Sequence, residues 1–223
     1  MSEACELPPR PGLSYRFDFR NLTEPYQKMQ IAPGVEATKW QGLKLDDSKS
    51  ADWDVAVDIL SARITERYIA PVDFLIASEE TKSPSDRRFG FTVLAIDCML
   101  VETLGAFIEG LEDTDGKSKR TFCNCLRTRP LFGAEFTTDD IAEKFYKQFR
   151  CGILHQAESG GESKVWSVGP ILFISGNSII VNRNKFHDCV KAEFQRYLSE
   201  LRDPKDSVLR NNFRKKMDFI CRS

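Results

Sequence analysis

Only two histidines, His155 and His187, occur in this chain of 223 residues, so chemistry that needs an imidazole has few candidates. His155 follows Arg150 within the stretch Phe-Arg-Cys-Gly-Ile-Leu-His-Gln-Ala-Glu at residues 149–158. An imidazole can take up or release a proton near neutral pH, and a guanidinium can pair with a phosphate. On an α-helix the two side chains would point about 140° apart. The arginine must therefore reach round the helix to meet a phosphate beside the imidazole.

This spacing, Arg-x-x-x-x-His in the context Tyr-x-x-Phe-Arg-Cys-Gly-Ile-Leu-His-Gln, lies on a predicted late helix of an apolar bundle. It resembles the HEPN superfamily of nucleotide-binding and RNA-cleaving helical domains. The likeness covers roughly residues 52–200 and includes a preceding long helix that contains Asp97 and Glu102. Members of the superfamily often carry Asn, Asp or His directly after the arginine, where this chain has Cys151.

The resemblance implies a metal-independent endoribonuclease of the toxin or defence type. Arg150 and His155 would be its catalytic residues, with His155 moving protons at the ribose 2′-hydroxyl and the leaving 5′-oxygen and Arg150 neutralising charge on the phosphate. One chain supplies one such histidine, so a homodimer would complete a composite site, as in HEPN nucleases. The supporting residues would be Cys151, Glu102, Asp97, Gln156 and Glu158.

Two other interpretations of the same residues stay open. In the first, the chain is a non-catalytic HEPN-type module in which Arg150 and His155 hold a nucleotide or a partner. In the second, His155 only packs near a helix C-terminus, where a partly positive imidazole is favourable by about 0.3 to 1 kcal/mol. The partners expected are RNA, a second copy of the chain, and an antitoxin such as a minimal nucleotidyltransferase. No cofactor and no metal is expected.

Other reactive residues give weaker signals. His187 follows Arg183 in the first turn of a predicted helix and is expected at the surface. Cys123 and Cys125 lie about 200° apart on a helix, and no second pair nearby would complete a zinc site. Cys151 precedes His155 by one helical turn, which suits a thiolate and imidazole pair, but no third group that would orient them is identifiable.

Two basic stretches could follow an RNA backbone, although solvated helix faces are the commoner origin of such stretches. The RNA-binding candidates in them are Lys119, Arg120, Arg127, Arg129, Lys215 and Lys216. The formal net charge of −1 argues against a wholly basic protein that wraps nucleic acid. At 41% hydrophobic and 11% aromatic residues, the chain can bury a sizeable core.

The cellular setting follows from the cysteines and the apolar stretches. Seven cysteines form no regular framework and the N-terminus has no apolar signal segment, so a reduced, cytoplasmic location is expected. The stretch from Phe89 to Leu111 is long enough to span a bilayer, but it contains Asp97, Glu102 and Glu109. We therefore expect a buried core helix and no membrane association.

Hydrophobic periodicity predicts the elements that must position these residues. Residues 1–50 are expected to form an N-terminal extension with a short strand, because apolar and polar residues alternate from Leu13 to Phe19. Helices are expected at about 52–69, with Pro71 ending or kinking the helix or the helix running on to residue 78. Further helices are expected at 89–111, 119–128, 139–158 and 183–201, and from Asp206 through Phe219.

Strands are expected at 165–168, 171–174 and 179–181, with Ser175-Gly176-Asn177-Ser178 as a tight hairpin turn. The sequence thus predicts a mainly α fold, a HEPN-like helical bundle with a small β-hairpin or sheet appendage. The HEPN-like domain would cover residues 51–223, with the hairpin inserted at about 165–181.

Overall fold

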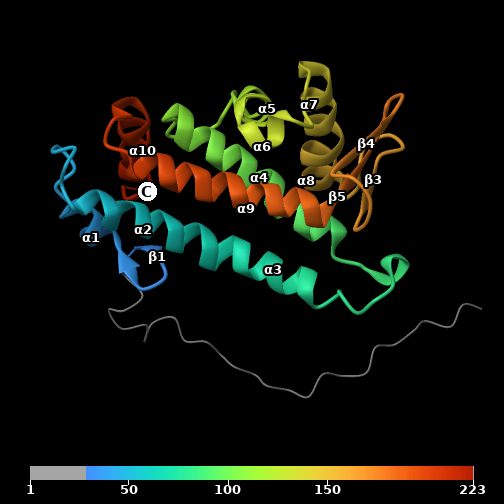
Figure 1. The fold of residues 1–223 in the computed structure, drawn as a ribbon, viewed down its shortest axis with the longest axis horizontal. Coiled ribbons are helices and arrows are strands. Elements are labelled where there is room, and N and C mark those ends of the chain that lie inside the picture. The colour runs from blue at the N-terminus through green and yellow to red at the C-terminus, as the bar shows by residue number, and fades with distance from the viewer. Residues whose placement is uncertain (1–28, 223) are drawn as a thin grey trace, which may run out of the picture.

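The computed structural model describes residues 29–222, and the strand expected at Leu13–Phe19 lies outside the described residues. The described chain is a bundle of helices with a two-stranded and a three-stranded sheet at its periphery (Figure 1). The predicted class, a helical bundle with a small sheet, is confirmed.

The first long helical run passes straight through Pro71. Helix α2 spans Asp52–Ile64, a π-helical turn η3 spans Thr65–Ile69, and α3 spans Ala70–Ala77. In an α-helix the proline ring clashes with the carbonyl four residues earlier, and the wider π turn directly before Pro71 accommodates it. The run therefore continues to Ala77, which was the longer of the two predicted ends. A 3₁₀ turn, η4 at Pro84–Asp86, then leads towards the centre of the bundle.

Helix α4, Gly90–Glu109, is the central helix and packs against α5 (Ser118–Thr128), α9 (Arg183–Arg202) and α10 (Ser207–Ile220). It ends at Gly110, whose φ of 64° is the left-handed conformation that glycine adopts readily. In the described part of the chain, α4 is the one helix with the length and apolar composition of a membrane span, and most of it is buried inside the protein.

The predicted helix at 139–158 is interrupted in its middle. A short helix α6, Pro130–Gly133, comes first, and Thr138 then caps α7, Asp139–Phe145, by accepting a hydrogen bond from the Ile141 N–H. A second π turn, η5 at Tyr146–Cys151, continues into α8, Gly152–Gln156. The run ends at Ala157, which has a positive φ of 55°. Arg150 thus lies in a π turn and His155 in the α-helix after it.

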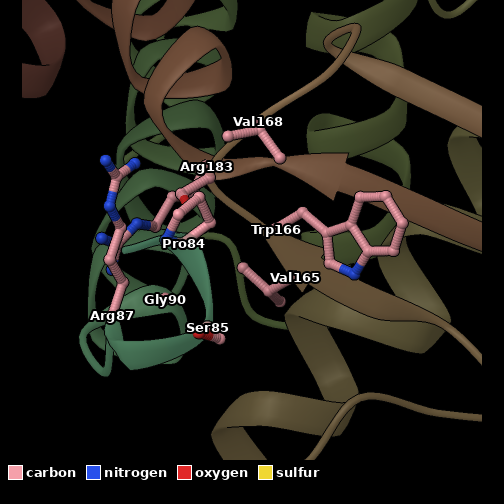
Figure 2. A pocket seen from close by; sticks show the side chains of 9 residues that line it. Pro84, Ser85, Arg87, Gly90, Val165, Trp166, Val168 and Arg183 are labelled. Atoms are coloured by element: carbon pink, nitrogen blue, oxygen red, sulfur yellow. The ribbon is translucent and has the colours of Figure 1, made fainter. Parts of the chain in front are cut away.

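The three-stranded sheet has the order β3-β5-β4, with β3 at Lys164–Trp166, β4 at Leu172–Ser175 and β5 at Ser178–Asn182. The pair β4 and β5 is the predicted tight hairpin, whereas β3 runs parallel to β5. Figure 2 shows Val165 and Trp166 of β3 beside Gly90 at the start of α4. The Asn182 side chain accepts hydrogen bonds from the first turn of α9, as predicted for a cap.

Three short elements precede α2 and were not expected: β1 (Gln30–Ala32), β2 (Val35–Glu36) and α1 (Ala37–Gln41). Trp40 of α1 packs edge-on against Phe213 of α10, with ring centroids 5.5 Å apart, and its indole N–H donates to Asp218 at 2.7 Å. The chain before α2 therefore joins the main core. The domain boundary near residue 50 stays a prediction.

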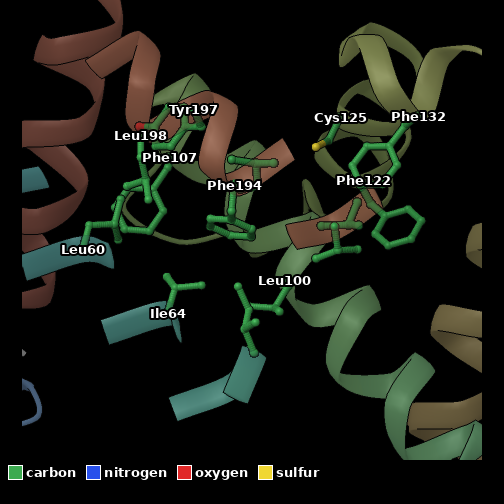
Figure 3. Close-up of a cluster of buried hydrophobic side chains, with 14 of the residues drawn as sticks. Leu60, Ile64, Leu100, Phe107, Phe122, Cys125, Phe132, Phe194, Tyr197 and Leu198 are labelled. Atoms are coloured by element: carbon green, nitrogen blue, oxygen red, sulfur yellow. The ribbon is translucent and has the colours of Figure 1, made fainter. Parts of the chain in front are cut away.

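The main core lies where α2, α4 and α9 meet. Figure 3 shows side chains from these three helices converging there, with Phe122 of α5 and Phe132 of α6 extending the cluster. This packing anchors the helices that carry the candidate site. The labelled members from α2, α4 and α9 are Leu60, Ile64, Leu100, Phe107, Phe194, Tyr197 and Leu198.

Candidate functional site: two hollows beside the motif helix

Arg150 opens to a hollow of about 460 Å³ between the helical run that carries it and helices α2, α4 and α10. Leu154, one turn later, lines the same hollow and is 48% exposed. Arg63 and Lys216 also line it, but both donate hydrogen bonds to backbone carbonyls, Arg63 to Ile31 and Lys216 to Glu112. We call this space the Arg150 hollow.

The guanidinium of Arg150 is held by Glu102 of α4. Its Nε and Nη2 lie 3.1 and 3.0 Å from Glu102 Oε2, and the guanidinium lies 5.5 Å from the centroid of the Tyr146 ring. Glu102 also accepts hydrogen bonds from the hydroxyls of Thr114 at 2.6 Å and Ser118 at 2.8 Å. Burial lowers the pKa of Arg150, but the charge of Glu102, the hydrogen bond it accepts from the guanidinium and the nearby Tyr146 and Cys151 together outweigh burial, and the pKa is raised. Arg150 is therefore a positioned, permanently charged cation.

His155 opens to a different hollow, of about 630 Å³, which we call the His155 hollow. Lys144, Lys147 and Cys151 line it from the preceding turns of the same helical run. Lys144 pairs with Asp140 at 2.9 Å. Among the described residues, neither the imidazole of His155 nor the ammonium of Lys147 has a hydrogen bond or an ion pair, and both residues are exposed.

The floor of the His155 hollow is built by close backbone packing. A Cβ added to Gly152 would lie 2.6 Å from the carbonyl oxygen of Glu158 and 3.0 Å from the nitrogen of Gly160, so only glycine fits where the chain folds back. Gln148 fixes the far wall, since its amide donates to the Asn177 carbonyl at 2.8 Å and accepts from Ser163. The hollow therefore has a closely packed base beneath the exposed side chains of Lys147 and His155.

Of the predicted site residues, the structure joins some and separates others. Glu102 contacts Arg150, while Cys151 and Gln156 line the His155 hollow. Glu158 is exposed and accepts the Ser159 N–H at 2.9 Å, next to the turn that closes α8. Within one chain, Arg150 and His155 open to different hollows, in line with the wide angle expected between them.

Asp97 is placed elsewhere, in a buried cluster with His187. His187 was expected at the surface, and that expectation is wrong: its side chain is fully buried, with Nδ1 2.7 Å from Asp97 Oδ1. Its Nε2 lies 3.4 Å from Oδ1 of Asp73, which also pairs with Lys191 at 2.6 Å. Burial raises the pKa of Asp97 to about 6 against the opposing hydrogen bond from His187. This cluster joins α3, α4 and α9 and touches neither hollow.

Most of the basic residues predicted to bind RNA are engaged in ion pairs. Lys119 pairs with Glu143, Arg120 with Glu109 and Arg127 with Asp139, at 2.6, 3.0 and 2.9 Å. Arg129 is 8% exposed and bridges α9 through Glu193 and Glu200 at 2.7 and 2.8 Å. Lys216 lines the Arg150 hollow, which leaves Lys215 exposed and without an ion pair in the described chain.

Comparisons with known proteins give no further assignment. No family model matches the chain, and neither the curated proteins nor the solved structures contain a match. The resemblance to the HEPN superfamily stays a prediction. Between residues 29 and 222, no group of three or more His, Cys, Asp or Glu side chains is arranged to hold a metal ion.

Sequence reasoning missed Lys144 and Lys147 as neighbours of His155. The signal was present, because Lys144, Lys147, Cys151 and His155 recur at intervals of three or four residues, the spacing of one helical face. The Arg-x-x-x-x-His spacing points to Arg150 instead, which lies on the neighbouring face of the run.

Proposed function

We propose that this protein is a metal-independent endoribonuclease that acts as a homodimer, with His155 as its acid–base residue. The observation that supports it best is an exposed imidazole, without a partner among residues 29–222, in a hollow that Lys144 and Lys147 also line. Cations beside an imidazole favour a phosphodiester there, and a free imidazole can exchange protons with it. Cleavage would follow from attack of the ribose 2′-oxygen on phosphorus.

The proton balance of this reaction explains why two copies are needed. One neutral His155 takes the proton from the 2′-hydroxyl, and a protonated His155 of the second copy gives a proton to the leaving 5′-oxygen. The products are a 2′,3′-cyclic phosphate and a 5′-hydroxyl end. Since Arg150 opens to a different hollow from His155 of its own chain, a second copy would also have to bring an Arg150 to the phosphate.

The apolar contact for such a dimer would centre on Leu154. Most large apolar residues of α4 and of the motif run are buried within one chain: Phe107 is 1% exposed and Phe145 and Phe149 are fully buried. Leu154 is 48% exposed and lines the Arg150 hollow. It is the part of that apolar surface still open to a second copy.

A second candidate, a non-catalytic module that binds RNA or a nucleotide, is favoured by the pair of Arg150 and Glu102. Two nitrogens of the Arg150 guanidinium already contact the Glu102 carboxylate. Because the carboxylate compensates its charge, Arg150 would stabilise the negative charge on a phosphoryl group less strongly. In that case the His155 hollow binds phosphate without cutting it.

The deciding experiment incubates the purified full chain with mixed RNA in EDTA and follows both binding and cleavage. We expect fragments that end in a 2′,3′-cyclic phosphate, a loss of about 100-fold or more in rate for His155→Ala, and a mass near twice 25.4 kDa by light scattering. Lys205→Ala, an exposed cation remote from both hollows, is the matched control and should behave as wild type.

Four outcomes would contradict the proposal of a homodimeric nuclease with His155 as its acid–base residue. RNA that is bound but never cut indicates the non-catalytic module. If the protein neither binds nor cuts RNA, both the nuclease and the non-catalytic RNA-binding module are contradicted. A monomer that still cleaves, or a His155→Ala variant with full activity, removes the composite site.

A further inference from the structure

A third hollow, of about 300 Å³, lies between strand β3 and the N-terminal end of α4, away from the two hollows of the motif helix. Its volume is at the lower end of the range for small-molecule sites. In Figure 2, Arg87 and Arg183 line one side of it, and Val165, Trp166 and Val168 line the other. We call it the β3–α4 hollow.

The cationic side includes Arg87, whose guanidinium has no carboxylate partner among the described residues. Arg87 donates only to the backbone carbonyls of Lys82 and Glu80, at 3.3 and 3.4 Å, and it has no ion pair within residues 29–222. Both contacts are long and both acceptors are neutral. The guanidinium of Arg87 can therefore turn to an anion at little cost.

Arg183 is a buried guanidinium with an unused donor. Its side chain is 2% exposed, and its Nη2 lies 2.6 Å from Glu79 Oε2. Its Nη1 is buried without a hydrogen-bond partner in the described part of the chain, which is rare because an unpaired buried donor is costly. Burial raises the pKa of Glu79, but hydrogen bonds from the Arg88 N–H, Arg183 and the Phe89 N–H outweigh it and lower the pKa to about 2. Glu79 is therefore ionised, and the carboxylate fixes Arg183 at the hollow.

The start of α4 adds a further positive end. Gly90 lines the hollow as the first residue of a 20-residue helix, whose N-terminus carries partial positive charge. A Cβ at Gly90 would lie 3.1 Å from Cγ1 of Val165, so the helix start and β3 are in close contact. The cationic wall and the apolar wall are thus held at a fixed separation.

The apolar wall of the β3–α4 hollow exposes large apolar side chains to solvent. Trp166 is 47% exposed and Val168 is 45% exposed, both at the rim of a hollow. Apolar side chains that border a cavity with convergent cations are typical of sites for organic ligands rather than for bare ions.

We propose that the β3–α4 hollow binds a small organic anion that carries a phosphate or carboxylate head on an apolar body. The head pairs with Arg87 and with the free Nη1 of Arg183 at the positive end of α4, and the body lies against Val168 and Trp166. The site does not depend on the proposed nuclease, because it shares no lining residue with the Arg150 or His155 hollow.

The test is a titration of the full chain followed by NMR at the tryptophan indole N–H groups. The chain has three tryptophans, and Trp40 and Trp53 are buried with their indole N–H groups bonded to Asp218 and to the Asp47 carbonyl. Phenyl phosphate and benzoate are the two probes, and they separate a phosphate head from a carboxylate head. We expect saturable shifts of the Trp166 signal alone, assigned with Trp166→Phe.

Matched variants decide which groups bind the head. Arg87→Gln should weaken binding of the better probe by about tenfold or more, whereas Arg88→Gln, the exposed neighbour that does not line the hollow, should leave it unchanged. Arg183→Lys, which keeps the charge beside Glu79, should weaken binding as well. If Arg183→Lys fails to fold, the Arg87 and Arg88 pair still decides the outcome.

The proposal is overturned by any of three results. Phenol that shifts Trp166 as strongly as phenyl phosphate shows that no anion is recognised. Inorganic phosphate that binds as tightly as phenyl phosphate shows that the apolar wall contributes nothing. No saturable shift with either probe in the millimolar range shows that the hollow does not bind this class of ligand.

Discussion

His155 is exposed at the end of α8 and has no partner among the described residues, whereas His187 is fully buried in α9 between Asp97 and Asp73. The first imidazole is accessible to a ligand, and the second is held by carboxylates that come from two other helices. The two histidines therefore have different structural roles. His155 is suited to chemistry, and His187 is suited to joining α3, α4 and α9.

The largest effect that tests this comparison is on stability. His187→Ala should lower the free energy of unfolding by about 3 to 5 kcal/mol, because it leaves the buried Asp97 carboxylate without its partner. His155→Ala should change it by less than about 0.5 kcal/mol, since an exposed side chain without partners is removed. Urea denaturation of both variants measures the difference. Equal losses of unfolding free energy in the two variants would contradict the different roles of the two histidines.

A second prediction concerns pH. The pKa of Asp97 is raised from 3.8 to about 6 by burial, against the hydrogen bond from His187, while Asp73 and Asp188 add to the rise. The folded protein therefore binds the proton more tightly than the unfolded chain, and stability from this group is lost as pH rises from about 4 to about 6.

Asp97→Asn isolates this contribution. It should flatten the pH dependence of the free energy of unfolding over that interval, by up to about 3 kcal/mol relative to wild type. Identical pH profiles for the two proteins would contradict the assignment to Asp97.

A smaller effect is expected at the pair that holds Arg150. Glu102→Gln should lower the free energy of unfolding by about 1 to 3 kcal/mol, because the half-buried guanidinium and two hydroxyls lose a charged acceptor. The same change should raise RNA affinity, because Arg150 becomes available to phosphate. Glu143→Gln, which breaks the exposed pair with Lys119, is the control and should stay within about 1 kcal/mol. Unchanged RNA affinity would show that Glu102 does not compete with the ligand.

The smallest effect is expected at Cys151, which lies half-buried on the wall of the His155 hollow. Cys151→Asn should change the free energy of unfolding by less than about 0.5 kcal/mol and should speed RNA cleavage if the residue after the arginine binds phosphate. Cleavage rate and thermal midpoint are measured on the same variant. A lower midpoint without a gain in rate would make Cys151 a packing residue.

The helices around His155 could be predicted because their signals are local. The cap at Thr138 and the apolar spacing from Phe145 to Phe149 define the helical run that leads into and through η5. The π turn itself could not be predicted, since it depends on packing that no local pattern encodes. The separation of Arg150 from His155 follows from the helical period alone.

The burial of His187 was missed although a signal for it existed. His187, Val190, Phe194 and Tyr197 recur at intervals of three or four residues, so His187 belongs to the apolar face of α9. Its partner Asp97 is 90 positions away in the chain, and no local pattern pairs the two. The pair of Glu79 and Arg183, which are 104 positions apart, could not be predicted from the sequence for the same reason.

Gly152 has a consequence for finding relatives of this protein by sequence. The backbone that folds back over it leaves no room for a Cβ, whether or not the helix carries a working arginine and histidine. A relative that has lost Arg150 or His155 but kept this turn should still carry glycine at the matching position. A chance Arg-x-x-x-x-His match need not carry it, so a glycine two residues after the arginine is the better marker of shared ancestry.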